Sequence, residues 1–147
     1  MRTRVDGEAL HRVRSARGLT QSQLARILDV AGGDRVSEWE RGVRGPAVRL
    51  IPAVAAALGV SPLEFLAMPN GVDLKALRLV SGKTLAEVAA QIHVSTATYL
   101  RWESGRQQAP KDPGVRRTLA RALGVRRTQL EAALAATILD SHPPSDI

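Results

Sequence analysis

Apolar residues along this chain recur three and four positions apart, and no long stretch alternates apolar and polar residues at every second position. Spacing of three and four marks one face of an α-helix, whereas alternation is typical of a β-strand. One such face is Leu24, Ala25 and Leu28, and another is Val88, Ala89 and Ile92. The pattern therefore predicts an all-α chain.

The helical pattern occurs twice. Residues 10–42, continuing to Leu58-Gly59-Val60, are echoed by residues 74–105, continuing to Leu123-Gly124-Val125. The shared signature is Arg-x-x-x-Gly-x-Thr, an apolar helical stretch, Trp-Glu-x-Gly and Ala-Leu-Gly-Val. Such a repeat predicts two copies of one small domain. We place the first at 1–68 and the second at 69–140, with a short turn-rich linker over 68–72 and a disordered tail over 141–147.

Each copy is predicted to hold five helices. Gly18 stops the first helix, and Thr20 with Gln23, like Thr84 with Glu87, fits the capping box that starts the second. The third covers about 34–41 and 96–104, and the fourth follows Pro46 or Pro113. The fifth opens at 61–64 and near 126, and is longer in the second copy. The first copy has one extra residue before its tryptophan, within Ala31-Gly32-Gly33.

Charge and composition narrow the classes of function. The chain holds 21 basic and 14 acidic residues, a formal charge of +7, which favours a polyanionic partner. Arginine dominates the basic residues, which suits phosphate and guanine recognition or reflects codon bias. The absence of cysteine excludes disulfides and thiolate metal sites. The longest apolar run, 50–60, is too short to cross a bilayer, so we expect a cytoplasmic protein without membrane contact.

Each copy resembles the helix-turn-helix domain of the phage-repressor and Cro-like family, also called the XRE type. The resemblance covers about 10–67 and 74–134. It is strongest at Gly18-Leu19-Thr20-Gln21-Ser22-Gln23-Leu24-Ala25, at Val36-Ser37-Glu38-Trp39-Glu40-Arg41-Gly42 and at Ala57-Leu58-Gly59-Val60-Ser61-Pro62. It implies two tandem five-helix lambda-repressor-like domains, each of which places its third helix in a DNA major groove about 12 Å wide.

The resemblance also implies which residues contact DNA. Base-edge positions fall on Gly33, Asp34, Arg35 and Glu38 in the first copy, and on Thr96, Ala97, Thr98 and Arg101 in the second. Arginine presents a forked donor to guanine, and threonine offers its methyl group to thymine. Carboxylates are repelled by phosphate but accept from cytosine, so base reading by the first copy stays open. Phosphate contacts are expected from Gln21, Arg41, Arg44 and Arg106, with Gln107 a further candidate.

Other distinctive residues are expected to be structural. Trp39 and Trp102 are core anchors, and the resemblance pairs Arg14 with Glu40 and Arg78 with Glu103. Tyr99 is expected to be buried, with a phosphate contact as the alternative. Arg2 and Arg4 form either a disordered basic terminus or an arm along DNA. The three histidines lack metal-ligand spacing, and we expect neither a metal nor another cofactor.

The leading hypothesis is a sequence-specific transcriptional regulator, a repressor, that binds double-stranded DNA. Its two unlike recognition helices imply an imperfectly palindromic operator. A homodimer through the fifth helix, with the seam Leu130, Leu134 and Ile138, stays open, as does packing of that seam inside the second copy. The alternative is an antitoxin or adaptor whose first domain binds a partner protein. An enzyme is not expected, because no Gly-rich phosphate loop, nucleophile elbow or metal cluster occurs.

Overall fold

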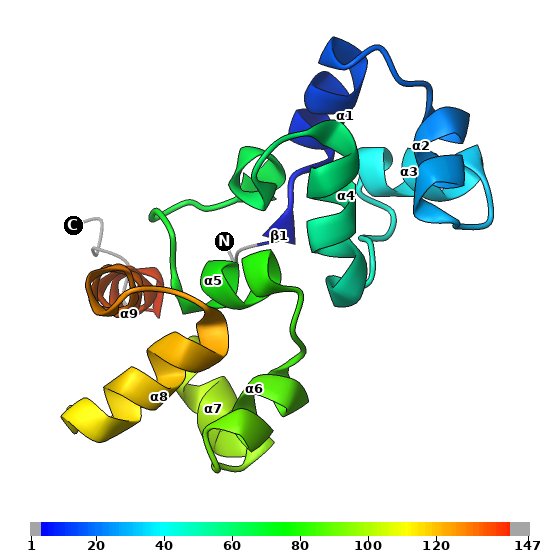
Figure 1. The fold of residues 1–147 in the computed structure, drawn as a ribbon. Helices are drawn as coiled ribbons and strands as arrows, with labels where there is room; N and C mark the ends of the chain where they lie inside the picture. The colour runs from blue at the N-terminus through cyan, green and yellow to red at the C-terminus, as the bar shows by residue number, and fades with distance from the viewer. Residues whose placement is uncertain (1–3, 142–147) are drawn as a thin grey trace, which may run out of the picture. The chain divides into compact units, whose positions relative to one another are not determined.

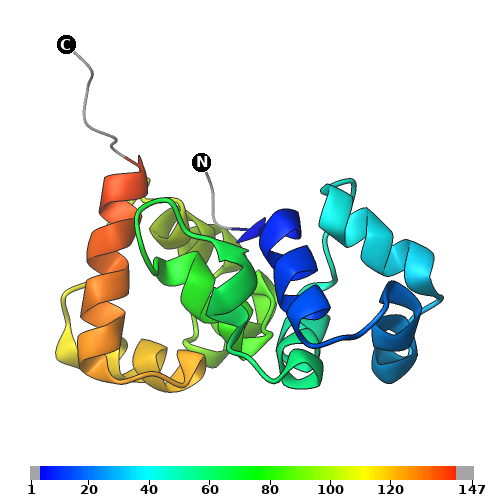
Figure 2. The ribbon, with the colours of Figure 1, turned by 90° about the horizontal axis from the view of Figure 1, so that it is seen from above.

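The computed structural model describes the backbone of residues 4–141 and the side chains of residues 4–138. The expectations for Arg2 and for the tail after Ser141 fall outside these described residues. The chain divides into two compact units, one over Arg4–Ala67 and one that begins at Met68. Figures 1 and 2 show helices as the main element of both. Within the described residues, no helix combines the length and hydropathy needed to span a bilayer.

The first unit is helical apart from one short ladder. Its elements are β1 (Arg4–Val5), α1 (Gly7–Ala16), α2 (Gln21–Leu28), α3 (Gly33–Arg41), the 3₁₀ turn η1 (Val48–Leu50), α4 (Ile51–Leu58), the 3₁₀ turn η2 (Pro62–Phe65) and β2 (Leu66–Ala67). β1 and β2 pair antiparallel, with Arg4 opposite Ala67 and Val5 opposite Leu66. The ladder brings the two ends of this unit together.

Within its described residues, the second unit consists of five helices. They are α5 (Leu74–Ser81), α6 (Leu85–Gln91), α7 (Thr96–Glu103), α8 (Pro113–Leu123) and α9 (Arg127–Ser141). α9 packs against α5 and α8, while α6 packs against α7 and α8. The all-α prediction is thus confirmed, because the only strands among the described residues are the two-residue β1 and β2.

Both second helices begin at the expected capping box. Thr20 Oγ1 accepts from the backbone N–H of Gln23 at 3.0 Å, and Gln23 Oε1 accepts from the backbone N–H of Thr20 at 2.9 Å. Thr84 and Glu87 repeat the arrangement at 3.2 and 3.1 Å. Two backbone N–H groups without helical partners are satisfied each time. The local sequence therefore determines where α2 and α6 start.

The C-terminal part of the first unit differs from the prediction. α4 begins at Ile51 with Pro52 in its first turn, after the 3₁₀ turn η1, so Pro46 precedes the helix by several residues. The expected fifth helix is reduced to η2, which leads directly into β2. Leu66 takes an extended backbone conformation, and the Phe65 carbonyl accepts from the N–H of Asp6 at 2.7 Å. After η2 the chain therefore pairs with β1 and does not continue as a helix.

Each unit buries its tryptophan, as predicted. Trp39 lies in the core of the first unit together with Phe65, which is fully buried and contributed by η2. In the second unit Trp102 packs edge-on against Tyr99, with ring centroids 6.3 Å apart and an interplanar angle of 75°. The burial of Tyr99 is also confirmed. These aromatic side chains anchor α3 and α7 in the cores of their units.

The face of α9 that carries Leu130, Leu134 and Ile138 mostly faces its own unit. Leu130 is fully buried and Leu134 is half-buried, whereas Ile138 is 39% exposed. Thr137 fastens α9 to the start of α5: its Oγ1 accepts from the backbone N–H of Leu74 at 2.9 Å and donates to the Ala133 carbonyl at 2.8 Å. α9 is therefore an integral part of the second unit.

Replacing Gly7 with alanine is expected to destabilise the first unit. A Cβ at Gly7 would stand 2.7 Å from the carbonyl oxygen of Trp39 and closer still to that of Glu40, so α1 would have to move away from the end of α3. We expect a loss of about 1–3 kcal/mol in the free energy of unfolding. Gly45→Ala is the matched control, because a Cβ there meets nothing within 4 Å. Native-state hydrogen exchange of the α1 and α3 amides measures the effect; equal protection in both variants would contradict it.

Candidate nucleic-acid interface

A buried ion pair holds three segments of each helix-turn-helix together. Arg14 Nε and Nη2 donate to Glu40 at 2.5 and 3.0 Å, and Arg14 Nη1 donates to the Leu19 carbonyl at 2.7 Å. The pair thus joins α1, the turn before α2 and the end of α3. The predicted Arg14–Glu40 pair is confirmed.

The second unit repeats this arrangement. Arg78 Nε and Nη2 each donate to Glu103 at 2.8 Å, and Arg78 Nη1 donates to the Lys83 carbonyl at 3.0 Å. Both side chains are almost fully buried. The predicted Arg78–Glu103 pair is therefore confirmed too, and it fixes α7 against α5.

Glu40 accepts more hydrogen bonds than Arg14 alone supplies. Its Oε1 lies 2.9 Å from His11 Nδ1 and accepts from Gln21 Nε2 at 3.1 Å. Burial alone would raise the pKa of Glu40, but the hydrogen bonds from Arg14, His11 and Gln21 outweigh burial and hold that pKa below its ordinary value. Glu40 therefore remains a carboxylate and positions the side chain of Gln21.

Gln21 and Arg41, two of the expected phosphate-binding residues, lie in one pocket. It has a volume of about 510 Å³ and is lined by residues of α1, α2 and α3, including Arg12 and Ser37. Gln21 keeps a second amide hydrogen beyond the one given to Glu40, and Arg41 Nε donates to Ser37 Oγ at 3.2 Å. Cationic and amide donors thus converge near the N-terminus of α2, where backbone N–H groups favour anions.

The N-terminal half of α7 presents polar groups on a capped helix. Ser95 caps α7 by accepting from the backbone N–H of Thr98 at 3.0 Å, while Thr96 and Ala97 are exposed and Thr98 is half-buried. Arg101 is exposed and held from two sides, since it donates to Thr98 Oγ1 at 3.2 Å and to Gln107 Oε1 at 3.1 Å. The guanidinium of Arg101 is therefore held in one orientation beside the side chain of Thr98.

The start of α3 is built differently. Gly32 precedes the helix with a φ of 150° and supplies no side-chain cap. Gly33 lies so close to α2 that a Cβ there would be 2.8 Å from Ser22 Oγ. The structure therefore places Gly33 in helix packing, whereas Asp34 and Arg35 are exposed. The first copy has one extra residue here. Its α3 therefore begins at an uncapped glycine turn, whereas α7 begins at the Ser95 cap.

Glu38 faces a neighbouring arginine. Arg44 Nε lies 3.6 Å from Glu38 Oε2, and Arg44 remains largely exposed. The backbone N–H groups of Val43 and Arg44 both donate to the Glu38 carbonyl, at 3.0 and 3.4 Å, which brings Arg44 back over the end of α3. The pair lowers the local negative charge at Glu38 and places Arg44 beside the helix. In the second unit Arg106 is exposed after α7 and has no ion pair among the described residues.

The structure adds residues that sequence reasoning did not place. Ser95 could have been found, because a serine directly before a helical stretch is a favoured N-cap. The sequence predicts only a phosphate contact for Gln107. No local pattern indicates its hydrogen bond with Arg101, which depends on how the loop after α7 folds back. Within residues 4–138, no group of three or more histidine, aspartate or glutamate side chains could hold a metal ion.

Comparison with known families gives one finding that covers most of the chain. A family model described as a helix-turn-helix domain matches residues 7–67 and again residues 71–133. No curated protein and no solved structure matches the chain significantly. Helix-turn-helix domains place a recognition helix in the major groove, so both matches indicate a DNA-binding regulator.

The Arg14–Glu40 pair is expected to make stability depend on pH. A carboxylate whose pKa is lower in the folded state stabilises the fold above its unfolded pKa, near 4.5, and this stabilisation is lost as pH falls through the folded value. Glu40→Gln, which cannot ionise, should be less stable than the parent at pH 7, and the difference should shrink below about pH 4.5. Thermal unfolding from pH 7 to pH 3 checks this. A constant difference would show that the charge of Glu40 does not contribute.

Proposed function

Because the chain belongs to the helix-turn-helix family, we propose that it is a sequence-specific transcriptional regulator that binds double-stranded DNA through two non-identical recognition helices, α3 and α7. We propose repression as its mode, by occupation of an operator. The domains are taken as 1–68 and 69–140. Their unlike recognition helices imply an operator with two unlike half-sites. If both helices read one face of the duplex, the half-site centres lie about 34 Å apart.

The arrangement of Arg101 carries this proposal. A guanidinium fixed by Thr98 and Gln107 loses little side-chain entropy on binding, and its fork matches the O6 and N7 acceptors of guanine. Thr96 and Ala97 are exposed one turn earlier, where they can approach a thymine methyl group. Arg101 supplies the specific hydrogen bonds, and its neighbours supply the shape of the contact.

The first recognition helix supports a narrower role in base reading. Arg35 is the exposed cation near the start of α3, and Asp34 beside it is repelled by phosphate and suited to cytosine. Gly33 packs against Ser22, so base contacts from this helix rest on Asp34, Arg35 and Glu38. The first unit contributes phosphate binding through Gln21, Arg41 and Arg44 and adds fewer base contacts than the second.

A second candidate function is suggested by the surface of the first unit. Ile27 on α2 and Val43 after α3 are 57% and 66% exposed. Exposed apolar side chains in the unit that also carries the acidic Asp34 suit a protein contact better than a phosphate contact. The alternative is therefore an antitoxin or adaptor whose first domain binds a partner protein while the second binds DNA.

Substitution of the two recognition arginines separates these functions. Selection of binding sites from random duplex DNA should enrich one sequence, and Arg101→Ala should weaken binding to it about tenfold to a hundredfold with relaxed preference at one base pair. Arg35→Ala should have a comparable effect if the first unit reads bases. Arg121→Ala, an exposed arginine on α8, is the matched control.

Each outcome of this binding assay assigns a role. Loss of affinity in both variants establishes two working recognition helices. An effect of Arg101→Ala alone makes the first unit a scaffold or partner-binding domain. Failure to enrich any sequence would overturn the regulator proposal in favour of the interaction module.

Phosphate-binding arginines are expected to leave a different signature. Arg44→Ala and Arg106→Ala should weaken binding to all sequences alike, because phosphates carry no sequence information. The slope of log affinity against log salt concentration should become shallower by about 1 for each substitution. Titrations at several salt concentrations measure this slope, with Arg121→Ala as the control. An unchanged slope would place these side chains away from the DNA backbone.

A further inference from the structure

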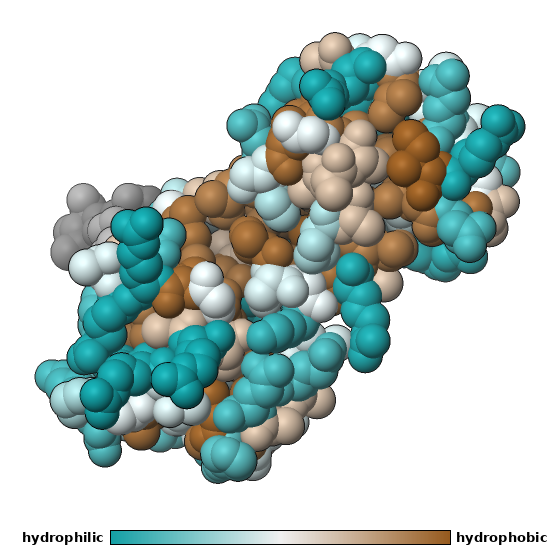
Figure 3. All heavy atoms as spheres, viewed as in Figure 1, coloured by the Kyte–Doolittle hydropathy of each residue, from teal (hydrophilic) through white to brown (hydrophobic). Residues whose placement is uncertain are grey.

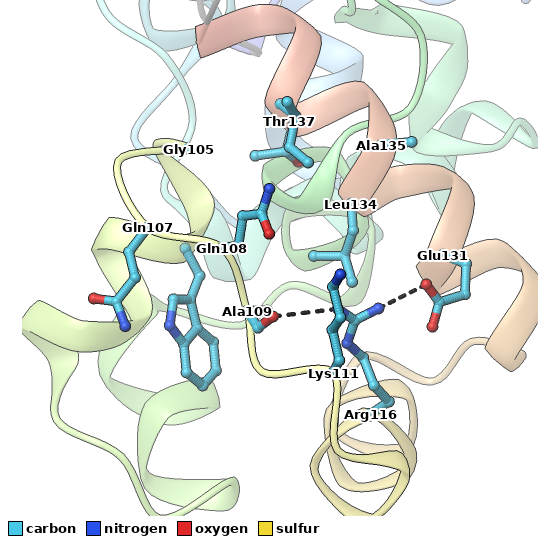
Figure 4. A pocket seen from close by; sticks show the side chains of 12 residues that line it. Gly105, Gln107, Gln108, Ala109, Lys111, Arg116, Glu131, Leu134, Ala135 and Thr137 are labelled. Carbon is cyan, nitrogen blue, oxygen red and sulfur yellow. Dashed lines mark hydrogen bonds and ion pairs between the residues drawn. The ribbon is translucent and has the colours of Figure 1, made fainter.

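The second unit contains a pocket between the loop that follows α7 and the helix α9. Its volume is about 300 Å³, at the small end of the range for ligand sites. One wall is the segment 105–111, and the other is the face of α9 that carries Leu134, Ala135 and Ile138, as Figure 4 shows for the labelled residues. All of its lining residues belong to the second unit.

The polar lining holds more donors than acceptors. Trp102 lines the pocket, and its indole Nε1–H is buried without a hydrogen-bond partner. Gln108 and Lys111 are exposed to solvent, and neither has a hydrogen-bond or ion-pair partner among the described residues. Figure 4 shows the amide of Gln108 and the amine of Lys111 directed toward Leu134 of α9. An unpaired buried donor costs free energy unless something accepts from it.

Among the described lining residues, Glu131 is the one carboxylate, and it already has partners. Glu131 accepts from Arg116 Nη1 at 2.6 Å and from Arg127 Nε at 3.1 Å. Hydrogen bonds from Arg127 and Arg116 lower the pKa of Glu131, so it stays ionised. Arg116 is engaged further by the carbonyls of Pro110 and Ala109, at 2.7 and 3.2 Å. The charge of Arg116 is therefore matched within the wall, and that of Lys111 is not.

We propose that this pocket binds a small carboxylate with a short apolar body. The carboxylate pairs with Lys111 and accepts from the surplus donors, and the apolar body lies against Leu134, Ala135 and Ile138. A neutral ligand would gain no ion pair with Lys111, and a larger ligand would exceed the volume. This placement uses Trp102, Gln108 and Lys111, the lining donors that have no partner among the described residues.

The pocket is connected to the recognition helix. Gln107 is a lining residue, and it contacts Arg101 twice: its Oε1 accepts from Arg101 Nε at 3.1 Å and its backbone N–H donates to the Arg101 carbonyl at 3.2 Å. A ligand that fixes the segment 105–111 against α9 therefore changes the position of Gln107 and, through it, that of the Arg101 side chain. Occupancy of the pocket regulates DNA affinity, an extension that rests on the proposed function.

Binding is tested on the full chain by NMR, with hexanoate as the probe. The ¹⁵N–¹H resonance of the Trp102 indole should move saturably with a Kd of about 1 mM, as expected for a ligand of this size. The Trp39 indole, in the first unit, should stay in place and is the internal control. Hexanamide, which has the same shape without the charge, should bind about fivefold more weakly or worse.

Variants make the binding test specific. Lys111→Met keeps the length of the side chain and should weaken hexanoate binding about fivefold to tenfold, whereas Lys75→Met on α5 should not change it. The pocket proposal is overturned if the Trp102 resonance does not move, if both indoles move alike, or if Lys111→Met binds as the parent does.

The regulatory step has its own measurement. Saturating hexanoate should change the affinity for the selected operator several-fold in the parent, and Gln107→Ala should abolish this change while hexanoate still binds. Binding of hexanoate with unchanged operator affinity in the parent would overturn the regulatory step. If the chain enriched no DNA sequence, the proposed function would fail while the NMR titration still decided the pocket.

Discussion

A buried arginine–glutamate pair is the interaction on which each helix-turn-helix depends. Removing two charges from water is costly, and the cost is offset only when geometry and additional hydrogen bonds are good. Arg14 and Arg78 meet this condition by donating to a glutamate through two nitrogens and to a turn carbonyl through the third. The first helix, the turn that follows it and the end of the recognition helix, about 25 residues further on, are thereby fixed at one point, and the direction of the recognition helix follows.

On this shared frame the two recognition helices have diverged. The second begins at a serine cap and supports its arginine from both sides, whereas the first begins at a glycine turn packed against α2. One inserted residue is enough for this difference. It leaves Gly32 at the N-cap position of α3, while Trp39 stays buried in the core. The chain therefore carries two helix-turn-helix domains with the same internal ion pair and unequal recognition surfaces.

The loop after α7 serves two neighbours. Its Gln107 supports Arg101, and the residues around Gln107 form a wall of the pocket against α9. α9 is itself fastened to α5 through Thr137, so this side of the pocket is firmly placed. A loop that supports Arg101 on one side and lines the pocket on the other is a route by which a bound ligand would act on the proposed DNA contact.

The sequence alone determined the features that depend on local signals. Capping boxes at Thr20 and Thr84, the repeat and the apolar faces predicted the helices, and the family resemblance predicted both ion pairs. The tertiary structure decided the rest. It shortened the fifth helix of the first unit to a 3₁₀ turn, because Phe65 and Leu66 join the start of the chain, and strands of two residues leave no alternating pattern to read. It placed Gly33 in packing and linked Gln107 to Arg101 for the same reason: such contacts are set by how distant segments fold together and have no spacing of their own in the sequence.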